Sequence, residues 1–267
     1  MIYKRLGDYK TGFTYVFSNN RKISNNKILD YIKSLKIPPA YLNVHISDTP
    51  NAKILAYGYD SKGRKQVMYN KEFTEKQSQD KFKRYMRLRK SIKKINKQID
   101  IDIDSTDIKK KEIAMIIRLI ITCGFRIGNA KYLKENNSYG LTTIEYKHLT
   151  FKDNSIEIEF IGKKGVLNKS ICDDKIIHDY LLANKDARTR VFSCSSSDVN
   201  EYLKALNKEI TSKDLRTWNA NELFLKFMKK TNKITDALKM VADKLHNTPA
   251  VCKKNYIDPI LIEKFSS

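Results

Sequence analysis

The segment from Asp107 to Cys123 constrains the fold more than any other part of the chain. Its isoleucines recur at helical spacing, which predicts a helix that lies inside a hydrophobic core. Gly124 follows at once and is typical of a helix end. Arg126 then lies between apolar neighbours, where a desolvated charge is costly unless it is paired. The sequence leaves open whether Arg126 pairs with an acid or clamps an anion.

Short strand patterns with one helix dominate the first seventy or so residues. The segments 53–59 and 64–69 are rich in strand formers and flank Asp60-Ser61-Lys62-Gly63, which predicts a β-hairpin. A hairpin at this place projects side chains suited to phosphate oxygens and base edges. They are Lys62, Arg64, Lys65, Gln66 and Tyr69.

The pattern becomes helical near residue 74. The segment 74–77 has a capping-box pattern, which predicts that a long helix begins there. We place a domain boundary at this change of composition, with a small β-rich domain at 1–74 and a larger domain at 75–267. Asp100, Asp102 and Asp104 lack the glycine and the final glutamate of a calcium loop, so a polar linker is predicted instead.

The larger domain contains a predicted three-stranded antiparallel sheet. Its strands are expected at 143–151, 155–161 and 167–171, with alternation clearest in the second. Helical patterns follow from residue 173 to near the end of the chain. The fold class predicted is therefore α+β, with a β-rich N-terminal domain and a mostly α-helical domain that includes this small sheet.

The charge of the chain points to a polyanionic partner. Lys and Arg number 52 against 30 Asp and Glu, which leaves a net charge of +22. The basic residues are interleaved with Tyr and Phe, which favours nucleic acid over a merely basic surface or a membrane-surface protein. No apolar run is long enough to span a bilayer, and the first residues lack the apolar stretch of a signal peptide.

The cysteines indicate neither a zinc site nor a disulfide framework. Cys123, Cys172, Cys194 and Cys252 are widely spaced and form no CxxC pair. We therefore expect an intracellular, reducing setting: the cytoplasm, with a virion or viral factory if the protein is viral, or a nucleoid if it is bacterial.

Five residues far apart in the sequence have distinctive local contexts. Arg126, Lys163 on a predicted hairpin tip, Arg216 before a helix, His246 and Tyr256 occur in that order. The pair Thr248-Pro249 predicts a helix start between the last two. Phosphoryl transfer to a tyrosine needs a nucleophilic phenol, cations on the non-bridging oxygens and an acid for the leaving 5′ oxygen. These five side chains supply such groups.

The chain resembles the type IB DNA topoisomerases, in particular the compact poxvirus-like and bacterial branch. Five blocks carry the resemblance, in the order that the family has. They are Asp60-Ser61-Lys62-Gly63-Arg64, Lys131-Tyr132-Leu133-Lys134-Glu135-Asn136 with Gly140-Leu141, Phe160-Ile161-Gly162-Lys163, Lys213-Asp214-Leu215-Arg216-Thr217, and the segment from His246 to Tyr256.

The resemblance implies a monomer clamped around double-stranded DNA, with neither a metal nor another cofactor. Tyr256 would form a 3′-phosphotyrosyl link, the cut strand would rotate, and religation would follow without ATP. Arg126 and Arg216 would clamp the non-bridging oxygens, His246 would hydrogen-bond one of them, and Lys163 would protonate the leaving oxygen. Without DNA, we expect Tyr256 or Lys163 to be displaced from the site.

The resemblance also implies that Gln66, Tyr69, Lys131 and Tyr132 contact DNA, together with the hairpin residues Lys62 and Arg64. Two other functions stay open on the sequence. A tyrosine recombinase shares the five residue types, but usually has His where this chain has Lys213, which favours the topoisomerase. A non-enzymatic, basic DNA-packaging protein would leave the five blocks unexplained.

Overall fold

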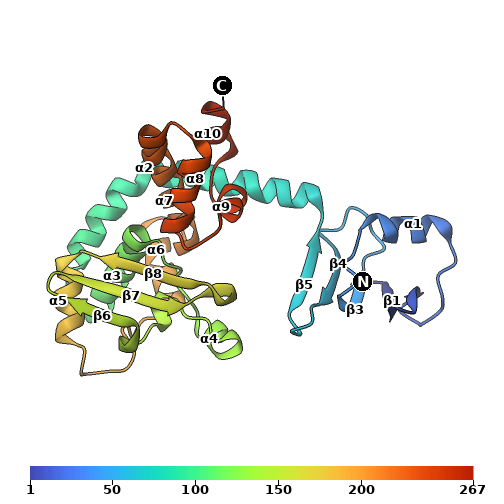
Figure 1. Ribbon diagram of the computed structural model, residues 1–267, viewed down its shortest axis with the longest axis horizontal. Helices are drawn as coiled ribbons and strands as arrows, with labels where there is room; N and C mark the ends of the chain where they lie inside the picture. The colour runs from blue at the N-terminus through green and yellow to red at the C-terminus, as the bar shows by residue number, and fades with distance from the viewer. Residues whose placement is uncertain (267) are drawn as a thin grey trace. The chain divides into compact units, whose positions relative to one another are not determined.

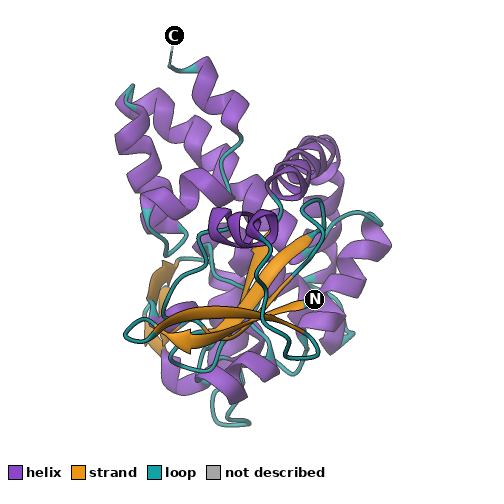
Figure 2. Cartoon of the chain, turned by 90° about the vertical axis from the view of Figure 1, so that its right-hand side faces the viewer, coloured by secondary structure: helices purple, strands orange, loops and turns teal. Residues whose placement is uncertain are grey.

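The computed structural model describes residues 1–266, and in it the chain forms two compact units (Figure 1). The first unit is Met1–Asp80 and the second begins at Lys81. Helix α2 (Lys71–Asp102) is continuous across that point. Strands occur in two separate antiparallel sheets, and helix makes up most of the remaining chain (Figure 2). The predicted α+β class is confirmed.

The first unit is a five-stranded antiparallel sheet with one face covered by helix α1 (Asn26–Ser34), which Asn25 caps. Apolar residues of the helix and of alternate strand positions form its core, because alternate side chains of a strand point to the same face. The order in the sheet is β2-β1-β3-β4-β5. The strands are β1 (Tyr3–Asp8), β2 (Gly12–Phe17), β3 (Leu42–Ile46), β4 (Ile54–Tyr59) and β5 (Lys65–Tyr69).

The predicted hairpin is confirmed, since β4 and β5 pair antiparallel on either side of the turn at 60–64. Helix α2, however, begins three residues before the predicted start. The side chain of Asn70 accepts a hydrogen bond from the backbone N–H of Glu72 at 2.8 Å, so Asn70 caps the helix directly after β5. Thr74 lies inside the first turn and donates its hydroxyl to the carbonyl of Lys71.

The second unit is mostly helical, with a three-stranded sheet in the order β6-β7-β8. The strands are β6 (Leu149–Lys152), β7 (Ser155–Ile161) and β8 (Leu167–Cys172). The helices after α2 are α3 (Ile108–Cys123), α4 (Ala130–Asn136), α5 (Lys175–Ala183), α6 (Ser196–Leu206), α7 (Ser212–Thr231), α8 (Ile234–Lys244), α9 (Pro249–Asn255) and α10 (Pro259–Lys264).

Helix α3 lies at the centre of the second unit, as its apolar sequence predicts. Asp107 caps its N-terminus, and Gly124 ends it in the left-handed conformation at φ 67°. Its isoleucines pack in one core with the inner face of the small sheet, which carries Ile156, Ile158 and Phe160. A second core joins helices α7, α8 and α9. These two cores fix the ends of α3, α8 and α9 in the same part of the unit.

Two sequence predictions in this unit are wrong in their limits. The first strand of the sheet begins at Leu149 rather than at residue 143, because two single turns of 3-10 helix occupy most of 141–148. A side chain closes each turn: the Thr143 hydroxyl accepts from the N–H of Gly140, and the His148 ring accepts from the N–H of Glu145, both at 3.0 Å. Local bonds of this kind replace the ladder bonds of a strand.

The predicted polar linker at 100–104 is also wrong over its first half, because α2 continues to Asp102. Asp102 is buried and accepts a hydrogen bond from the hydroxyl of Tyr202. Asp100 forms an ion pair with Arg118 at 3.3 Å. Sequence spacing does not reveal these partners, which come from distant helices.

The close packing around Gly124 gives a prediction for stability. A Cβ on Gly124 would meet the carbonyl oxygen of Lys244 at 2.3 Å, and the residue is at φ 67°. We expect Gly124→Ala to lower the free energy of unfolding by more than about 2 kcal/mol, from left-handed strain plus the clash. Gly165→Ala is the matched control, because Gly165 has φ 74° and open space around it. Urea unfolding followed by circular dichroism measures both; equal losses would contradict the role of the Lys244 contact.

Candidate active site

Arg216 is buried near the start of α7, with only 3 % of its surface exposed. Its Nη1 donates to the carbonyl of Gly124, and its Nη2 donates to the carbonyl of Leu245 at 3.1 Å. These carbonyls belong to the residues that end α3 and α8. Its Nε has no hydrogen-bond partner among residues 1–266. Across residues 1–266 no carboxylate pairs with this guanidinium, so its charge is solvated by backbone dipoles but not neutralised.

Arg126 lies in the loop that follows α3 and is half-buried. Its Nη2 donates to the side-chain oxygen of Asn247 at 2.6 Å. The loop is held close to the chain after α4, because a Cβ on Gly128 would meet the Cα of Gly140 at 2.7 Å. In the described part of the chain Arg126 has no acidic partner either. Of the two alternatives that the sequence leaves open, the geometry therefore favours the anion clamp.

Tyr256 follows α9 directly, and Thr248 caps that helix with Pro249 at its first position, as predicted. The guanidinium carbon of Arg216 lies 5.5 Å from the centre of the phenol ring. Burial alone would raise the pKa of Tyr256, but the charges of Arg216 and Arg126 and a hydrogen bond from Arg216 outweigh it. The pKa of Tyr256 is therefore held below its ordinary value, which favours the nucleophilic phenolate.

Two asparagines that were not predicted from the sequence hold Tyr256 and Arg126 in place. Asn221 of α7 donates to the carbonyl of Tyr256 at 2.8 Å and accepts from the N–H of Asp258 at 2.8 Å. It is fully buried. Asn247 orients Arg126 and donates to the carbonyl of Leu245 at 3.1 Å. The available signal was weak: a polar Asn221 beside apolar positions of a helix, and Asn247 directly after His246.

His246 lies between α8 and α9 in the left-handed conformation, at φ 53°. Its ring stacks on Phe125, with the ring centres 4.9 Å apart, and its Nε2 donates to the carbonyl of Cys123 at 3.1 Å. Burial, and then repulsion by Arg216, Arg126 and Lys244, lowers the pKa of His246 to about 4. The ring is therefore neutral near pH 7.

Lys163 is placed differently. It is exposed at the tip of the β7–β8 hairpin, where Lys164 and Gly165 have φ of 66° and 74°. Its side chain has no hydrogen bond or ion pair to any residue from 1 to 266. The structure thus brings Arg126, Arg216, His246 and Tyr256 into one cluster and leaves Lys163 outside those contacts. Of the two groups expected to be displaced without DNA, Tyr256 lies beside the arginines.

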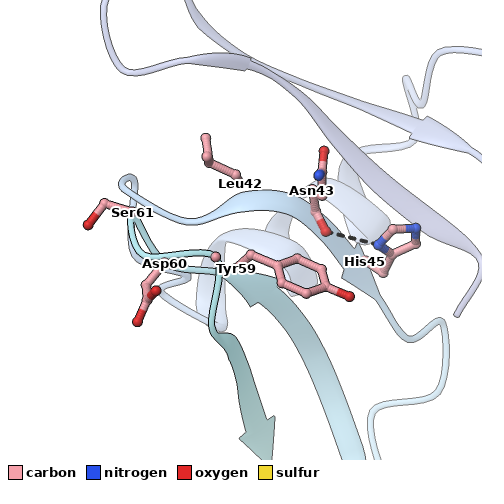
Figure 3. A pocket seen from close by; sticks show the side chains of 7 residues that line it. Leu42, Asn43, His45, Tyr59, Asp60 and Ser61 are labelled. Carbon is pink, nitrogen blue, oxygen red and sulfur yellow. Dashed lines mark hydrogen bonds between the residues drawn. The ribbon is translucent and has the colours of Figure 1, made fainter. Parts of the chain in front are cut away.

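The predicted DNA contacts of the first unit are organised by Asp60. Its carboxylate accepts from the Nε of Arg64 at 2.9 Å and from the side-chain amide of Gln66 at 3.0 Å. The hydrogen bond and charge of Arg64, with the backbone N–H groups of Arg64 and Lys62, lower the pKa of Asp60 to about 2. An open hollow with a volume of about 580 Å³ lies beside this turn. Figure 3 shows Asp60 and Ser61 at its rim and the Nδ1 of His45 bonded to the carbonyl of Asn43 at 3.0 Å.

The remaining predicted DNA contacts have exposed side chains. Lys62 is exposed on the same turn, and Tyr69 at the end of β5 stacks on Phe73. Lys131 and Tyr132 lie in the first turn of α4, and the phenol of Tyr132 is 59 % exposed. An exposed lysine or tyrosine retains its donors for a phosphate, so each of these residues could take part in DNA binding.

Among the described residues, no helix combines the length and the apolar character that crossing a bilayer would take.

Comparison with known proteins identifies the family. Residues 70–259 match the family model "Eukaryotic DNA topoisomerase I, catalytic core", and residues 12–60 match "Bacterial DNA topoisomerase IB, N-terminal domain". Among solved structures, the post-cleavage complex of the XerH site-specific recombinase has a TM-score of 0.44 at 14% identity. It covers 67% of this chain and 51% of that one, and at this distance it carries no argument.

Curated relatives agree with the family models. The chain is 31% identical to DNA topoisomerase 1B of Acanthamoeba polyphaga mimivirus, over 95% of this chain and 84% of the relative. It is 26% identical to DNA topoisomerase 1B of vaccinia virus, over 96% and 88% of the two chains. DNA topoisomerase 1 of rabbit fibroma virus is 26% identical, over 90% and 82%. The chain therefore belongs to the type IB DNA topoisomerases, isomerases that bind DNA.

Proposed function

We propose that the protein relaxes supercoiled double-stranded DNA as a monomer, through a transient 3′-phosphotyrosyl link to Tyr256. The observation that carries this proposal is a pair of guanidinium groups that have no acidic partner in residues 1–266: Arg216 lies beside the phenol, and the charge of Arg126 acts on the same phenol. Two unneutralised cations next to a nucleophile form a site for the negative charge that develops on a phosphate under attack.

The phenolic oxygen of Tyr256 loses its proton to solvent and attacks the phosphorus, and the bond from phosphorus to the 5′ oxygen breaks. The electron pair goes to that oxygen, which takes a proton from Lys163. The product is a phosphotyrosine at the 3′ end and a free 5′ hydroxyl. Religation is the reverse, so the energy of the phosphodiester is kept in the link and no ATP is consumed.

Lys163 must reach the leaving oxygen from the exposed tip of its hairpin. The backbone there is bent at Lys164 and Gly165, and the buried Asn168 packs under Gly162 and bonds to the carbonyl of Val166 at 2.8 Å. We propose that DNA orders the Lys163 side chain, because a phosphate offers the ammonium its missing partner.

His246 changes its charge state in this proposal. Its Nε2 donates to Cys123, so the neutral ring presents Nδ1 only as an acceptor. A scissile phosphate would offset the charges of Arg216 and Arg126 that depress its pKa, and protonation would then let Nδ1 donate to a non-bridging oxygen.

Contacts from Lys62, Arg64, Gln66 and Tyr69 in the first unit, and from Lys131 and Tyr132 in the second, would hold the duplex. We also place the activity inside the cell, as four buried free cysteines suit a reducing compartment.

The test of the chemistry is relaxation of a supercoiled plasmid in EDTA and without ATP. We expect a ladder of relaxed topoisomers and, after a denaturing quench, protein linked to DNA. Tyr256→Phe abolishes both because it removes the nucleophile, while Tyr9→Phe, at a phenol that is 72 % exposed in the first unit, retains both. Supercoils left intact by the wild-type protein would overturn the proposal.

The pKa of His246 predicts acid sensitivity. Its folded pKa of about 4 lies below the ordinary 6.5, so the unfolded chain binds the extra proton between these values. Stability is therefore full above pH 6.5 and falls as the pH drops toward 4. Between pH 7 and pH 4.5, His246→Gln should therefore lose roughly 2 kcal/mol less free energy of unfolding than the wild-type protein does. This figure is discounted for the exposed part of the ring. Urea unfolding of both proteins at pH 7 and pH 4.5 measures it, and parallel losses would refute it.

The exposed Lys62 predicts a change in salt dependence. If its ammonium contacts one phosphate, Lys62→Ala lowers the slope of log Kd against log salt concentration by about 1 and weakens binding to all sequences alike. Filter binding of a duplex between 50 and 200 mM salt measures the slope. Lys10→Ala, also exposed in the first unit, is the control. An unchanged slope in Lys62→Ala would show that this lysine lies away from the DNA.

A further inference from the structure

Helix α2 is bonded to the two elements that carry Arg216 and Tyr256. Arg84 forms an ion pair with Asp214, two residues before Arg216, at 3.1 Å. Tyr85 donates to Glu222 of α7 at 3.3 Å. One turn earlier, the ammonium of Lys81 donates to the carbonyl of Asn255, the residue before Tyr256, at 2.9 Å.

Lys81 is partly buried and has charged neighbours of both signs. Burial and the charges of Lys213 and Arg84 lower its pKa to about 8, against the attraction of Asp258. Asp258 is itself buried and caps α10 through the N–H of Ile260 at 3.1 Å. Burying the ammonium here costs desolvation free energy. The Asn255 carbonyl and the Asp258 carboxylate stabilise its charged form.

The hydrogen bond from Lys81 satisfies a carbonyl at the C-terminal end of α9. Its last carbonyls have no partner inside the helix, and the C-terminal end of a helix attracts a cation. Lys81 supplies that cation at Asn255. On the other side, Asn221 holds the carbonyl of Tyr256. The peptide before the phenol and the peptide after it are therefore each bound by a side chain from a different helix.

We propose that Lys81 is a positioning residue for the covalent step, which fixes the α9 end so that the phenol of Tyr256 stays beside the two arginines. This inference rests on the proposed function of Tyr256. The reason for a kinetic effect is that a displacement of about 1 Å in a nucleophile can cost up to 100-fold in rate. Lys81 would act on the rate of attack and not on DNA affinity, since its ammonium already has a protein partner.

The experiment compares Lys81→Met with Lys90→Met. Lys90 is exposed on the same helix, so its variant loses the same charge without the Asn255 contact. With protein in excess, a denaturing quench measures the rate at which protein becomes covalently attached to plasmid DNA. The affinity for a duplex is measured separately, with each variant in the Tyr256→Phe background so that no link forms. Melting temperatures show whether the fold is intact.

We expect Lys81→Met to attach about 10-fold more slowly than wild type, with a duplex Kd within about 2-fold of that of Lys90→Met. Lys81→Arg keeps both charge and donor and should recover most of the rate. Equal attachment rates in Lys81→Met and Lys90→Met would overturn the inference. So would a Kd that rises as much as the rate falls, because Lys81 would then be a DNA contact.

Two further outcomes concern the stability of Lys81→Met and the activity of the wild-type protein. If Lys81→Met melts more than about 10 °C below wild type, Lys81→Gln replaces it, because Gln retains an N–H donor of shorter reach. Lys81→Gln should attach more slowly than wild type and Lys90→Met, but less than about 10-fold more slowly. An unchanged attachment rate would contradict a positioning role for Lys81. A wild-type protein that forms no covalent adduct would refute the proposed function as well as this inference, whereas normal attachment in all variants would refute the inference alone.

Discussion

The structure of the second unit depends on how Arg216 is solvated. A buried guanidinium usually requires a carboxylate, but here two backbone carbonyls at the ends of α3 and α8 accept its hydrogen bonds. Carbonyls at helix C-termini carry partial negative charge, which stabilises the cation without cancelling it. The arginine therefore keeps its positive charge beside Tyr256. The left-handed Gly124 is what allows the end of α3 to approach α8 closely enough for both carbonyls to be used.

That uncancelled charge favours the deprotonated form of both of its titratable neighbours. It stabilises the phenolate of Tyr256 and destabilises the protonated ring of His246, so the pKa of each group falls. The free site is thus prepared for the nucleophile, but its histidine has not yet become a cation. A phosphate would relieve the excess positive charge and favour protonation of His246. The same electrostatic imbalance thereby couples binding of the anion to the last hydrogen bond of the proposed site.

Local signals in the sequence predict the elements, and tertiary contacts decide the rest. Asp107, Gly124 and the pair Thr248-Pro249 are strong signals because each satisfies backbone groups within its own turn. Asn70 was missed because the capping box at 74–77 offered a competing start, which the helix overrides by beginning directly after β5. Nothing in the spacing of Asn221 predicts its bonds to residues 35 and 37 positions away. The sequence suggested the grouping of Arg126, Arg216, His246 and Tyr256 through their local contexts and the needs of phosphoryl transfer, and the family resemblance gave each its role. No local rule predicts the contacts between residues so far apart in the chain.

Two acids that lie close in sequence to Arg216 and Tyr256 leave the positive charge of the cluster unneutralised. Asp214 lies two residues before Arg216, yet its carboxylate is occupied by Thr211, at 2.6 Å from the hydroxyl, and by Arg84. Asp258 lies two residues after Tyr256, and it caps α10 and faces Lys81. Both of these acids are thus engaged by other groups. An amide and backbone carbonyls hold the two arginines, and these ligands fix geometry without supplying negative charge. In the proposed function, a phosphate of the DNA supplies that charge.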